Sequence, residues 1–562
     1  MERLARELQL ERLAARVLAC RGLGEPAEAE RFLACRLADL PDPFLMKGME
    51  RAVARLSAAL EAGERIALYG DYDVDGVTST ALLASFLREA GGDVVTYVPH
   101  RLVEGYGLNT EAVRRLAAQG ARLLVSLDCG ITSLAEVRAA AELGVDAVVV
   151  DHHMVPVELP AAVAILNPHQ SGCGYPFKPL AAVGVTFCLT LALRKRLRET
   201  GRFGAVRPEP NLRRALDLVA LGTIADVVSL TGVNRVLVRW GLEELSQARR
   251  PGVRALKQVA GIPAGAPVTA GQVGFSLGPR INAAGRLDDA ARGVRLLLET
   301  EEPEAVALAG ELDRENRARR EIEREVLEQA LVMAKERVHS GARGLVLARE
   351  NWHAGVIGIV ASRLAERFHR PAILVSIAGG IGKGSGRSIE GFHLYDALVH
   401  CAPRLAQFGG HRHAAGLTLE AASLPGFRED FEVYARDRLR NEDLVPRCRI
   451  EGSLGIRDVT ERAVQGLAEL APYGAGHPEP LFALRGRPQH VRTVGPGGTH
   501  LKLGFGAGVD AIGFSLADRL SLCSGGVEAA VTLGFDDWSG TRRLQLKIKD
   551  LRAASGDGMV PN

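Results

Sequence analysis

Short apolar runs alternate with amphipathic stretches between about residues 51 and 230. Three of these runs, at 65–70, 122–127 and 145–150, have the length and character of buried strands. A helical apolar pattern follows the first of them over 78–88. This alternation predicts a mostly parallel sheet with helical crossovers.

The hydrophobic pattern changes along the rest of the chain. Residues 1–50 and 236–340 have helical periodicity, and an apolar seam through the charged stretch 303–338 predicts one long connecting helix. Strands and helices alternate again over 341–440. Short strands separated by turn residues fill 445–552, as in a small β-barrel, and 553–562 form a polar tail. We therefore expect an α/β multidomain protein whose first sheet domain spans 51–235.

Composition narrows the class of protein. At 562 residues the chain is too long for one hydrophobic core, and three or four domains are expected. The formal net charge of +3 is nearly balanced, so a surface for nucleic acid would have to be local. The eight cysteines form neither a CxxC pair nor a zinc spacing, which predicts reduced thiols. No uncharged apolar run approaches the roughly 20 residues of a membrane span, so we expect a cytoplasmic protein without membrane contact.

Acidic and imidazole side chains follow each of the three predicted strands. Asp71, Asp73 and Asp75 follow the first strand, Asp128 follows the second, and Asp151-His152-His153 follows the third. Because the carboxyl ends of parallel strands meet at one edge of a sheet, these groups should gather there. Clustered carboxylates repel one another, and a divalent cation is the usual compensation. The pattern predicts a metal site.

Two single residues are weaker candidates. Asp226 closes the apolar segment 212–225, so it is either a surface residue at a helix end or a site residue near the predicted metal. Arg101 lies in a polar loop after a predicted strand. It could bind a phosphate or simply be solvated, and loops on a rigid scaffold favour binding residues.

Three segments rich in small residues combine glycine with cations and hydrogen-bonding groups. They lie at 278–286, 382–388 and 409–416. Glycines let backbone N–H groups approach phosphate oxygens, and arginine adds a two-pronged donor. The alternatives are a domain-joining loop for the first segment, an ordinary turn for the second and structural histidines for the third. The side chains concerned are Arg280, Asn282, Arg286, Ser385, Arg387, Ser388 and His411.

These motifs together resemble the RecJ-type single-strand DNA exonucleases of the DHH phosphoesterase family. The segments that carry the resemblance are, in order, YGDYDVDG, LDCG, DHH, GTIADVV, GPRINAAGR, WHAGVIGIVASR, GSGRS and GGHRHAAG. It covers the chain from about residue 50 to the end of the predicted barrel. It implies a DHH-type parallel sheet domain and a DHH-associated α/β domain, joined by a long helix. A C-terminal OB-type barrel would close a ring over the cleft between them.

The resemblance also implies an activity. The family hydrolyses single-stranded DNA from the 5′ end to mononucleotides with Mn²⁺ or Mg²⁺, in DNA recombination and repair. It suggests a monomer that works with a helicase and a single-strand binding protein. No docking motif for either partner is visible in the sequence, and residues 1–50 show no chemistry.

Residue roles follow from the same resemblance. Two metal ions would be held by Asp73, Asp75, Asp128, His152 and Asp226. His153 would contact the scissile phosphate or transfer a proton. Asp151 would orient an imidazole, and Asp71 would contact the metal ligands without binding the metal itself. The bound strand would meet His353, Ser385, Arg387, Ser388 and His411 in the second lobe and Arg280, Asn282 and Arg286 at the junction. Ser385, Arg387 and Arg280 are the candidates for gripping a 5′ phosphate.

Two alternatives remain open at this stage. One is a DHH phosphodiesterase acting on short oligoribonucleotides or cyclic dinucleotides, or a pyrophosphatase, although the terminal barrel exceeds what those reactions need. The other is a non-catalytic scaffold of a replication assembly that has lost its metal site. Every expected ligand is present in this chain, which favours an enzyme.

Overall fold

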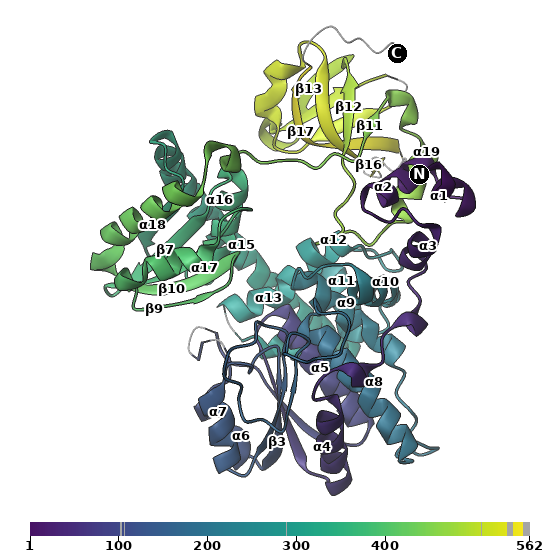
Figure 1. Cartoon of the computed structure of the whole chain (residues 1–562), viewed down its shortest axis with the longest axis vertical. Helices are drawn as coiled ribbons and strands as arrows, with labels where there is room; N and C mark the ends of the chain where they lie inside the picture. The colour runs from purple at the N-terminus through teal and green to yellow at the C-terminus, as the bar shows by residue number, and fades with distance from the viewer. Residues whose placement is uncertain (102–103, 106, 288, 507, 537–542, 555–562) are drawn as a thin grey trace.

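The described residues of the computed structural model form three β-sheets, each packed on helices (Figure 1). The structure describes residues 1–562 except 102–103, 106, 288, 507, 537–542 and 555–562. The predicted tail at 553–562 therefore lies mainly outside the described residues. No helix in the described part of the chain is both long enough and apolar enough to cross a membrane.

The first sheet is parallel throughout, in the order β2-β1-β3-β4-β5. Alternate residues of β1 face two separate cores: Ile66 and Leu68 face the larger one, and Ala67 and Tyr69 face the smaller one under α6 and α7. The bounds are β1 (Arg65–Gly70), β2 (Asp93–Tyr97), β3 (Ala121–Leu127), β4 (Asp146–Val150), β5 (Ala164–Leu166), α4 (Met49–Ala62), α5 (Val74–Glu89), α6 (Thr110–Ala118), α7 (Leu134–Glu142) and α8 (Ala182–Glu199).

Further helices extend the larger of these cores. It continues through Leu312, so the expected division at 235 falls inside one packed unit, which we call the catalytic lobe (residues 46–312). The segment 278–286 is helical, so the alternative of a domain-joining loop is wrong. The helices are α9 (Leu216–Ala225), α10 (Gly232–Gln247), α11 (Pro251–Val259), α12 (Ala270–Gln272), α13 (Gly278–Leu287) and α14 (Ala291–Leu298).

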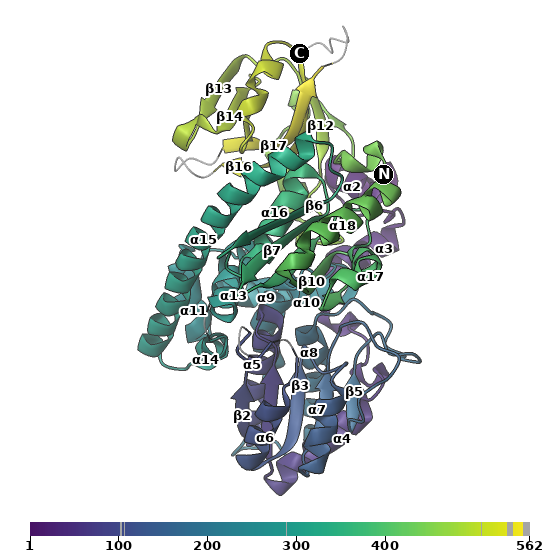
Figure 2. The same cartoon turned by 90° about the vertical axis from the view of Figure 1, so that its left-hand side faces the viewer.

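The long helix α15 (Glu302–His339) leads from the catalytic lobe to a second lobe, as the sequence predicted (Figure 2). The second sheet has the order β6-β7-β8-β10-β9. The glycine-rich stretch at 382–388 is largely strand β8 rather than a turn. A Cβ at Gly384 would lie 2.7 Å from Leu417 on the neighbouring strand, so the glycines make room for large apolar side chains. The bounds are β6 (Leu345–Glu350), β7 (Ala372–Ala378), β8 (Ile381–Arg387), β9 (Gln407–Gly410), β10 (Ala414–Glu420), α16 (Ile357–Phe368), α17 (Leu394–His400) and α18 (Leu424–Arg438).

The third sheet forms the C-terminal domain, with seven strands in the order β11-β12-β16-β17-β15-β14-β13. The N-terminal helices pack into its core instead of standing apart. The bounds are β11 (Ser453–Leu454), β12 (Phe482–Gly486), β13 (His490–Val494), β14 (His500–Gly504), β15 (Asp510–Gly513), β16 (Val527–Asp536), β17 (Arg543–Ala553), α19 (Glu461–Ala468), α1 (Glu2–Glu7), α2 (Arg12–Cys20) and α3 (Pro26–Ala34).

Candidate metal centre

The turn between β1 and α5 presents the first group of acids. Asp73 caps α5, and its Oδ1 accepts hydrogen bonds from the backbone N–H groups of Asp75 (2.9 Å) and Gly76 (3.2 Å). A Cβ at Gly76 would lie 2.4 Å from the carbonyl oxygen of Asp71, so only glycine lets the helix begin this close to the strand end. The sequence Asp71-Tyr72-Asp73-Val74-Asp75-Gly76 therefore fixes the acids at the carboxyl edge of the sheet.

The other acids are held by their own local contacts. Asp75 is buried and accepts hydrogen bonds from the N–H groups of Ala182 (2.6 Å) and Val183 (2.8 Å) at the start of α8, a helix whose own N-cap residue supplies no side-chain acceptor. Asp128 follows β3 in the left-handed region, at φ 64°. Val227, directly after Asp226, has φ 61°, a strained conformation for a β-branched residue. Strain of this kind is concentrated at functional sites.

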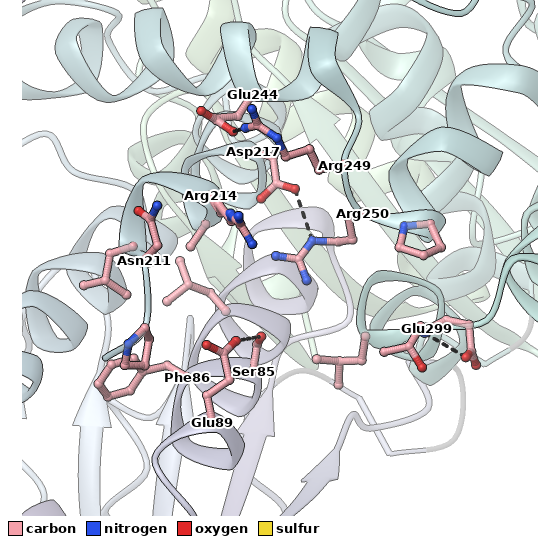
Figure 3. Close-up of a pocket in the computed structure, with 17 residues that line it drawn as sticks. Ser85, Phe86, Glu89, Asn211, Arg214, Asp217, Glu244, Arg249, Arg250 and Glu299 are labelled. Atoms are coloured by element: carbon pink, nitrogen blue, oxygen red, sulfur yellow. Dashed lines mark hydrogen bonds and ion pairs between the residues drawn. The ribbon is translucent and has the colours of Figure 1, made fainter. Parts of the chain in front are cut away.

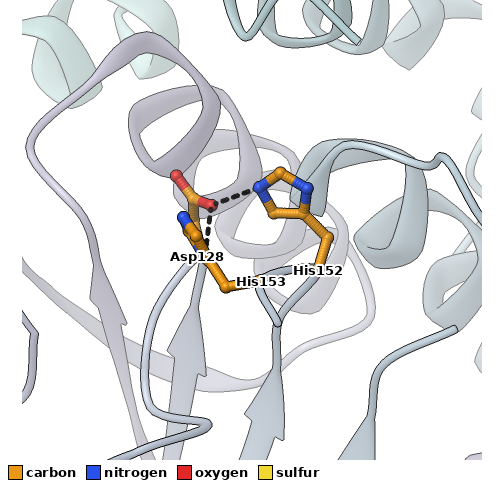
Figure 4. A group of neighbouring side chains, drawn as sticks. All are labelled: Asp128, His152 and His153. Carbon is orange, nitrogen blue, oxygen red and sulfur yellow. Dashed lines mark ion pairs between the residues drawn. The ribbon is translucent and has the colours of Figure 1, made fainter. Parts of the chain in front are cut away.

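Imidazole and carboxylate atoms converge at this edge (Figure 4). His152 Nε2 lies 3.3 Å from Asp128 Oδ1, 3.6 Å from Asp226 Oδ2 and 3.8 Å from Asp75 Oδ2. Among the residues that the structure describes, three overlapping groups have candidate ligand atoms within 4.8 Å of one another. They are Asp128, His152 and His153; Asp75, His152 and Asp226; and Asp71, Asp73 and Asp128. The structure thus brings together all five residues expected to bind metal, and it adds Asp71 and His153 to their neighbourhood.

The electrostatics of this cluster favour a bound cation. Burial and the neighbouring acids raise the pKa values of Asp71, Asp128 and Asp226 well above the ordinary range. Burial lowers the pKa of His152 to about 4, which keeps its imidazole neutral. Within the described part of the chain, Asp71 Oδ1, Asp226 Oδ2 and His152 Nε2 are buried and have no hydrogen-bond partner. Buried polar atoms rarely lack a hydrogen-bond partner, so these atoms are placed to bind an ion. A donor set of mostly oxygen atoms with one imidazole fits Mn²⁺ or Mg²⁺.

His153 is oriented by Asp151. Its Nδ1 lies 2.8 Å from Asp151 Oδ1, and the same carboxylate accepts hydrogen bonds from the backbone N–H groups of His152, His153 and Ile131. Burial alone would lower the pKa of His153, but the hydrogen bond to Asp151 raises it above the ordinary value. The side chain of His153 is 44% exposed, whereas that of Asp151 is buried. Asp151 is therefore placed to hold an imidazole whose other face is accessible.

Three arginines gather where the two lobes meet. Burial, together with the nearby charges of Arg101 and Arg387, lowers the pKa of Arg286 to about 10. The guanidinium of Arg101 lies over the ring of Tyr72, 4.9 Å from its centroid. Arg286 also donates to the carbonyl oxygen of Gly355 (3.1 Å), so it joins α13 to the second lobe. Guanidiniums packed this closely repel one another, which favours an anion between them.

The second-lobe residues expected to bind the strand form two sets: one faces the junction with the catalytic lobe, and the other makes local contacts. Arg387 on β8 is partly buried, and its Nη1 lies 3.5 Å from Ser385 Oγ. The pKa of His411 is lowered by burial and by the charges of His413, Arg387 and His153, which places His411 within electrostatic reach of the metal-binding edge. Ser388 and His353 make local contacts. Ser388 Oγ donates to the carbonyl oxygen of Phe392 (2.8 Å), and His353 Nδ1 accepts from the N–H of Gly355 (3.0 Å).

Two junction residues have structural partners. The guanidinium of Arg280 donates to Asp313 Oδ1 (3.0 Å) and to the carbonyl oxygens of Ser276 and Val259. These contacts occupy the group expected to grip a 5′ phosphate. Asn282 Oδ1 accepts from the N–H of Val74 (3.1 Å) at the start of α5, so Asn282 steadies the acid-bearing turn.

Sequence reasoning assigned no binding role to Tyr72 or Gly355. Tyr72 stands between two of the acids, and that position was the available signal. A Cβ at Gly355 would lie 2.6 Å from the carbonyl oxygen of Arg286, a contact between the lobes that no local pattern encodes.

A cavity of about 330 Å³ lies elsewhere in the catalytic lobe (Figure 3). Its wall contains two ion pairs, Asp217 with Arg250 and Glu244 with Arg249. None of the candidate site residues lines it. The cavity is therefore separate from the acid cluster and takes no part in its chemistry.

Comparison with known proteins identifies the family to which the chain belongs. Family models match at residues 65–223 (DHH family, N-terminal domain), 341–437 (DHHA1 domain) and 450–550 (RecJ OB domain). Curated relatives described as single-stranded-DNA-specific exonuclease RecJ include those of Dickeya dadantii, 44% identical over 95% of both chains, and Escherichia coli, 41% identical over 97% of this chain and 96% of that one. The crystal structure of RecJ in complex with Mn²⁺ from Thermus thermophilus matches with a TM-score of 0.84 and 35% identity, covering 98% of this chain and 78% of that one. This chain belongs to the RecJ family of DHH proteins.

Proposed function

We propose that this protein is a metal-dependent exonuclease that hydrolyses single-stranded DNA from the 5′ end to mononucleotides, in DNA recombination and repair. The observation that carries the proposal is the convergence of carboxylates and a neutral imidazole at one sheet edge, within electrostatic reach of Arg286 on α13 and of His411 in the second lobe. The full-length match to RecJ exonucleases supports the substrate class.

Asp73, Asp75, Asp128, His152 and Asp226 would hold two ions, which when bound supply Lewis acidity and an activated water. The chain's own groups do the positioning. Asp151 fixes the ring of His153 through Nδ1, so any contact of that ring with a phosphate oxygen is made by Nε2. Asn282 and Gly76 hold the acid-bearing turn against the strand end.

The arginine group supports recognition of a strand end. Arg286 and Arg387 are partly buried, and Arg101 lies close enough to both to lower their pKa values. A terminal phosphate carries more charge than an internal one, and planar guanidiniums bind phosphate oxygens with two hydrogen bonds. We therefore propose that Arg101, Arg286, Arg387 and Ser385 bind the 5′ phosphate. Arg280 would hold α13 in position instead of contacting the phosphate.

One experiment tests the reaction. Single strands labelled separately at each end are incubated with purified protein and Mn²⁺, beside matching duplex and RNA. We expect early release of labelled mononucleotide from the 5′ label, with duplex spared. Asp73→Ala together with Asp75→Ala should abolish hydrolysis while strand binding persists, and unchanged hydrolysis would refute the metal assignment. Cleavage of short RNA or cyclic dinucleotides instead would refute the substrate.

The family resemblance alone supports the proposals on partners. A helicase would supply single strands, a single-strand binding protein would keep them extended, and the protein would act as a monomer. Co-sedimentation of the purified chain with each partner checks these proposals.

A further inference from the structure

The N-terminal helices complete the core of the C-terminal domain. Leu4 and Leu18 are fully buried and share one hydrophobic core with Leu454, Phe482 and Leu501. Figures 1 and 2 both show α2 and α3 beside this domain, far from the sheet of the catalytic lobe that follows them in sequence. The described residues of 1–34 and 450–554 therefore form one folded body, which we call the terminal unit.

One buried arginine ties the terminal unit to the catalytic lobe. Arg235 on α10 is 2% exposed. It donates to the carbonyl oxygen of Phe32 in α3 (3.1 Å) and to those of Ala471 and Pro472 after α19 (3.0 and 3.1 Å). Its guanidinium also stacks on the ring of Phe32, 3.8 Å from the centroid. A single side chain thus joins α10 to both halves of the terminal unit.

The charge of Arg235 makes this joint hard to open partway. Burial lowers its pKa to about 10, which leaves the guanidinium charged at neutral pH. No carboxylate pairs with it among the residues that the structure describes, so three carbonyl oxygens, the side chain of Cys35 and the face of the Phe32 ring compensate for its lost hydration. A buried charge is tolerated only while its donors are satisfied. Partial separation would leave donors of the guanidinium unsatisfied, so we expect the contacts of this joint to open together.

Backbone contacts at the same joint are equally close. The N–H of Leu230, just before α10, donates to the carbonyl oxygen of Ala475 (2.7 Å). Gly476 has φ 70°, and a Cβ there would lie 2.0 Å from Ser229 Oγ. The loop 471–477 is therefore fitted to the catalytic lobe without room for a side chain at this position.

A second arginine holds the two halves of the terminal unit together. Arg21, after α2, donates to Glu451 Oε1 (2.7 and 2.9 Å), to the carbonyl oxygen of Pro478 (2.7 Å) and to His477 Nδ1 (2.7 Å). His477 Nε2 in turn donates to the carbonyl oxygen of Leu470 (3.0 Å). The loop 471–477, which Arg235 contacts from the catalytic lobe, is thus also held by a residue that follows the N-terminal helix α2.

We infer that Arg235 is a positioning residue that locks the terminal unit onto the catalytic lobe, and that this lock sets the selectivity for single strands over duplex. The lobes, α15 and the segment that joins the second lobe to the terminal unit form a ring, which the contact at Arg235 closes (Figure 1). We expect a fixed terminal unit to restrict which strands reach the acids, and a released one to restrict them less. The selectivity part of this inference rests on the proposed function; the lock itself does not.

The test uses the full chain and the variants Arg235→Ala and Arg235→Lys. Arg214→Ala serves as the matched control, because Arg214 is an exposed arginine of the same lobe. Hydrogen exchange of segments 226–236 and 470–478 reports the lock without any nuclease activity. Arg235→Ala should raise exchange in both segments about tenfold or more, with the first sheet unchanged. Arg235→Lys keeps the charge but loses the planar guanidinium with its several donors. The exchange rates of this variant should lie between those of Arg235→Ala and the wild-type chain.

The catalytic readout compares kcat/KM for a single strand, its blunt duplex and a 5′-phosphorylated dinucleotide. We expect Arg235→Ala to lower the single-strand to duplex ratio about tenfold, with the dinucleotide unchanged because it is too short to need the ring. Should that variant fail to fold, Gly476→Ala reaches the same joint from the terminal unit. Unchanged exchange overturns the lock. Raised exchange with an unchanged ratio overturns its role in selectivity, and loss of hydrolysis on every substrate in the wild-type chain overturns the proposed function instead.

Discussion

Replacing Asp128 by Asn should stabilise the metal-free protein and remove its stabilisation by Mn²⁺. Asp128 belongs to a group with Asp71 and Asp73 whose ligand atoms lie within 4.8 Å of one another. Two carboxylates at that separation repel by about 3.5 kcal/mol at an effective dielectric constant of about 20. Proton uptake and screening relieve part of this repulsion, so we expect a gain of about 1–2 kcal/mol in the free energy of unfolding without metal.

Thermal melts with and without Mn²⁺ measure both effects. A ligand at about 100 times its Kd adds about 2.7 kcal/mol to the folded state. For a unit the size of the catalytic lobe, that corresponds to a rise in Tm of about 5–10 °C in the wild-type chain. The Asp128→Asn variant should melt about 2–8 °C higher than the wild-type chain without metal, and its response to Mn²⁺ should fall below about 1 °C.

Asp217→Asn is the matched control. Asp217 is also a buried aspartate of the catalytic lobe, but it pairs with Arg250 (3.1 Å), and its acidic neighbour Glu244 pairs with Arg249. Its replacement should lower Tm and leave the response to Mn²⁺ intact. If Asp128→Asn instead melts below the wild-type chain without metal and keeps the full Mn²⁺ shift, the acid cluster is not the metal site.

Three further predictions concern other contacts. Arg280→Ala leaves the buried carboxylate of Asp313 with only the exposed Arg317 and should cost about 3 kcal/mol in denaturant melts, while the preference of the remaining folded enzyme for 5′-phosphorylated ends persists. Gly285→Ala places a Cβ 2.5 Å from the carbonyl oxygen of Tyr72 and should lower kcat about tenfold or more with little change in far-ultraviolet circular dichroism. Burial lowers the pKa of His477 to about 4, so protonation opposes folding. Stability of the terminal unit is complete above pH ~6.5 and should fall by up to about 3 kcal/mol towards pH ~4, and His477→Gln should flatten that profile.

The periodicity of the sequence was enough to place the catalytic edge. The runs at 65–70, 122–127 and 145–150 coincide closely with β1, β3 and β4, since a buried parallel strand needs a continuous apolar run that ends where polar groups begin. Asp226 was ambiguous because a helix-end acid looks the same in a site and on a surface. Only the packing of α9 against α5 resolves it, by placing Asp226 Oδ2 3.6 Å from His152.

Contacts between distant segments could not be predicted. Arg280 carries the same local signal as Arg286, but Asp313, 33 residues further along, holds the first and not the second. The glycines of β8 have the composition of a turn, and they form a strand because large side chains on β7 and β10 fill the space they leave. The N-terminal helices gave no sign of their partner, since the barrel core they complete begins more than 400 residues later.

The positions of the arginines connect end recognition to the arrangement of the lobes. Arg286 belongs to α13 of the catalytic lobe, yet it donates to Gly355 of the second lobe, and Arg387 comes from that lobe's sheet. The side chains proposed to bind the 5′ phosphate therefore come together only while the two lobes keep one relative position. Helix α15 is the stiff link between the lobes. Asn282, about one helical turn before Arg286 on α13, contacts the acid-bearing turn. A shift of α13 would disturb Arg286 and the metal edge together, so α13 would couple the proposed phosphate-binding arginines to the acids. That coupling favours removal of one nucleotide at a time.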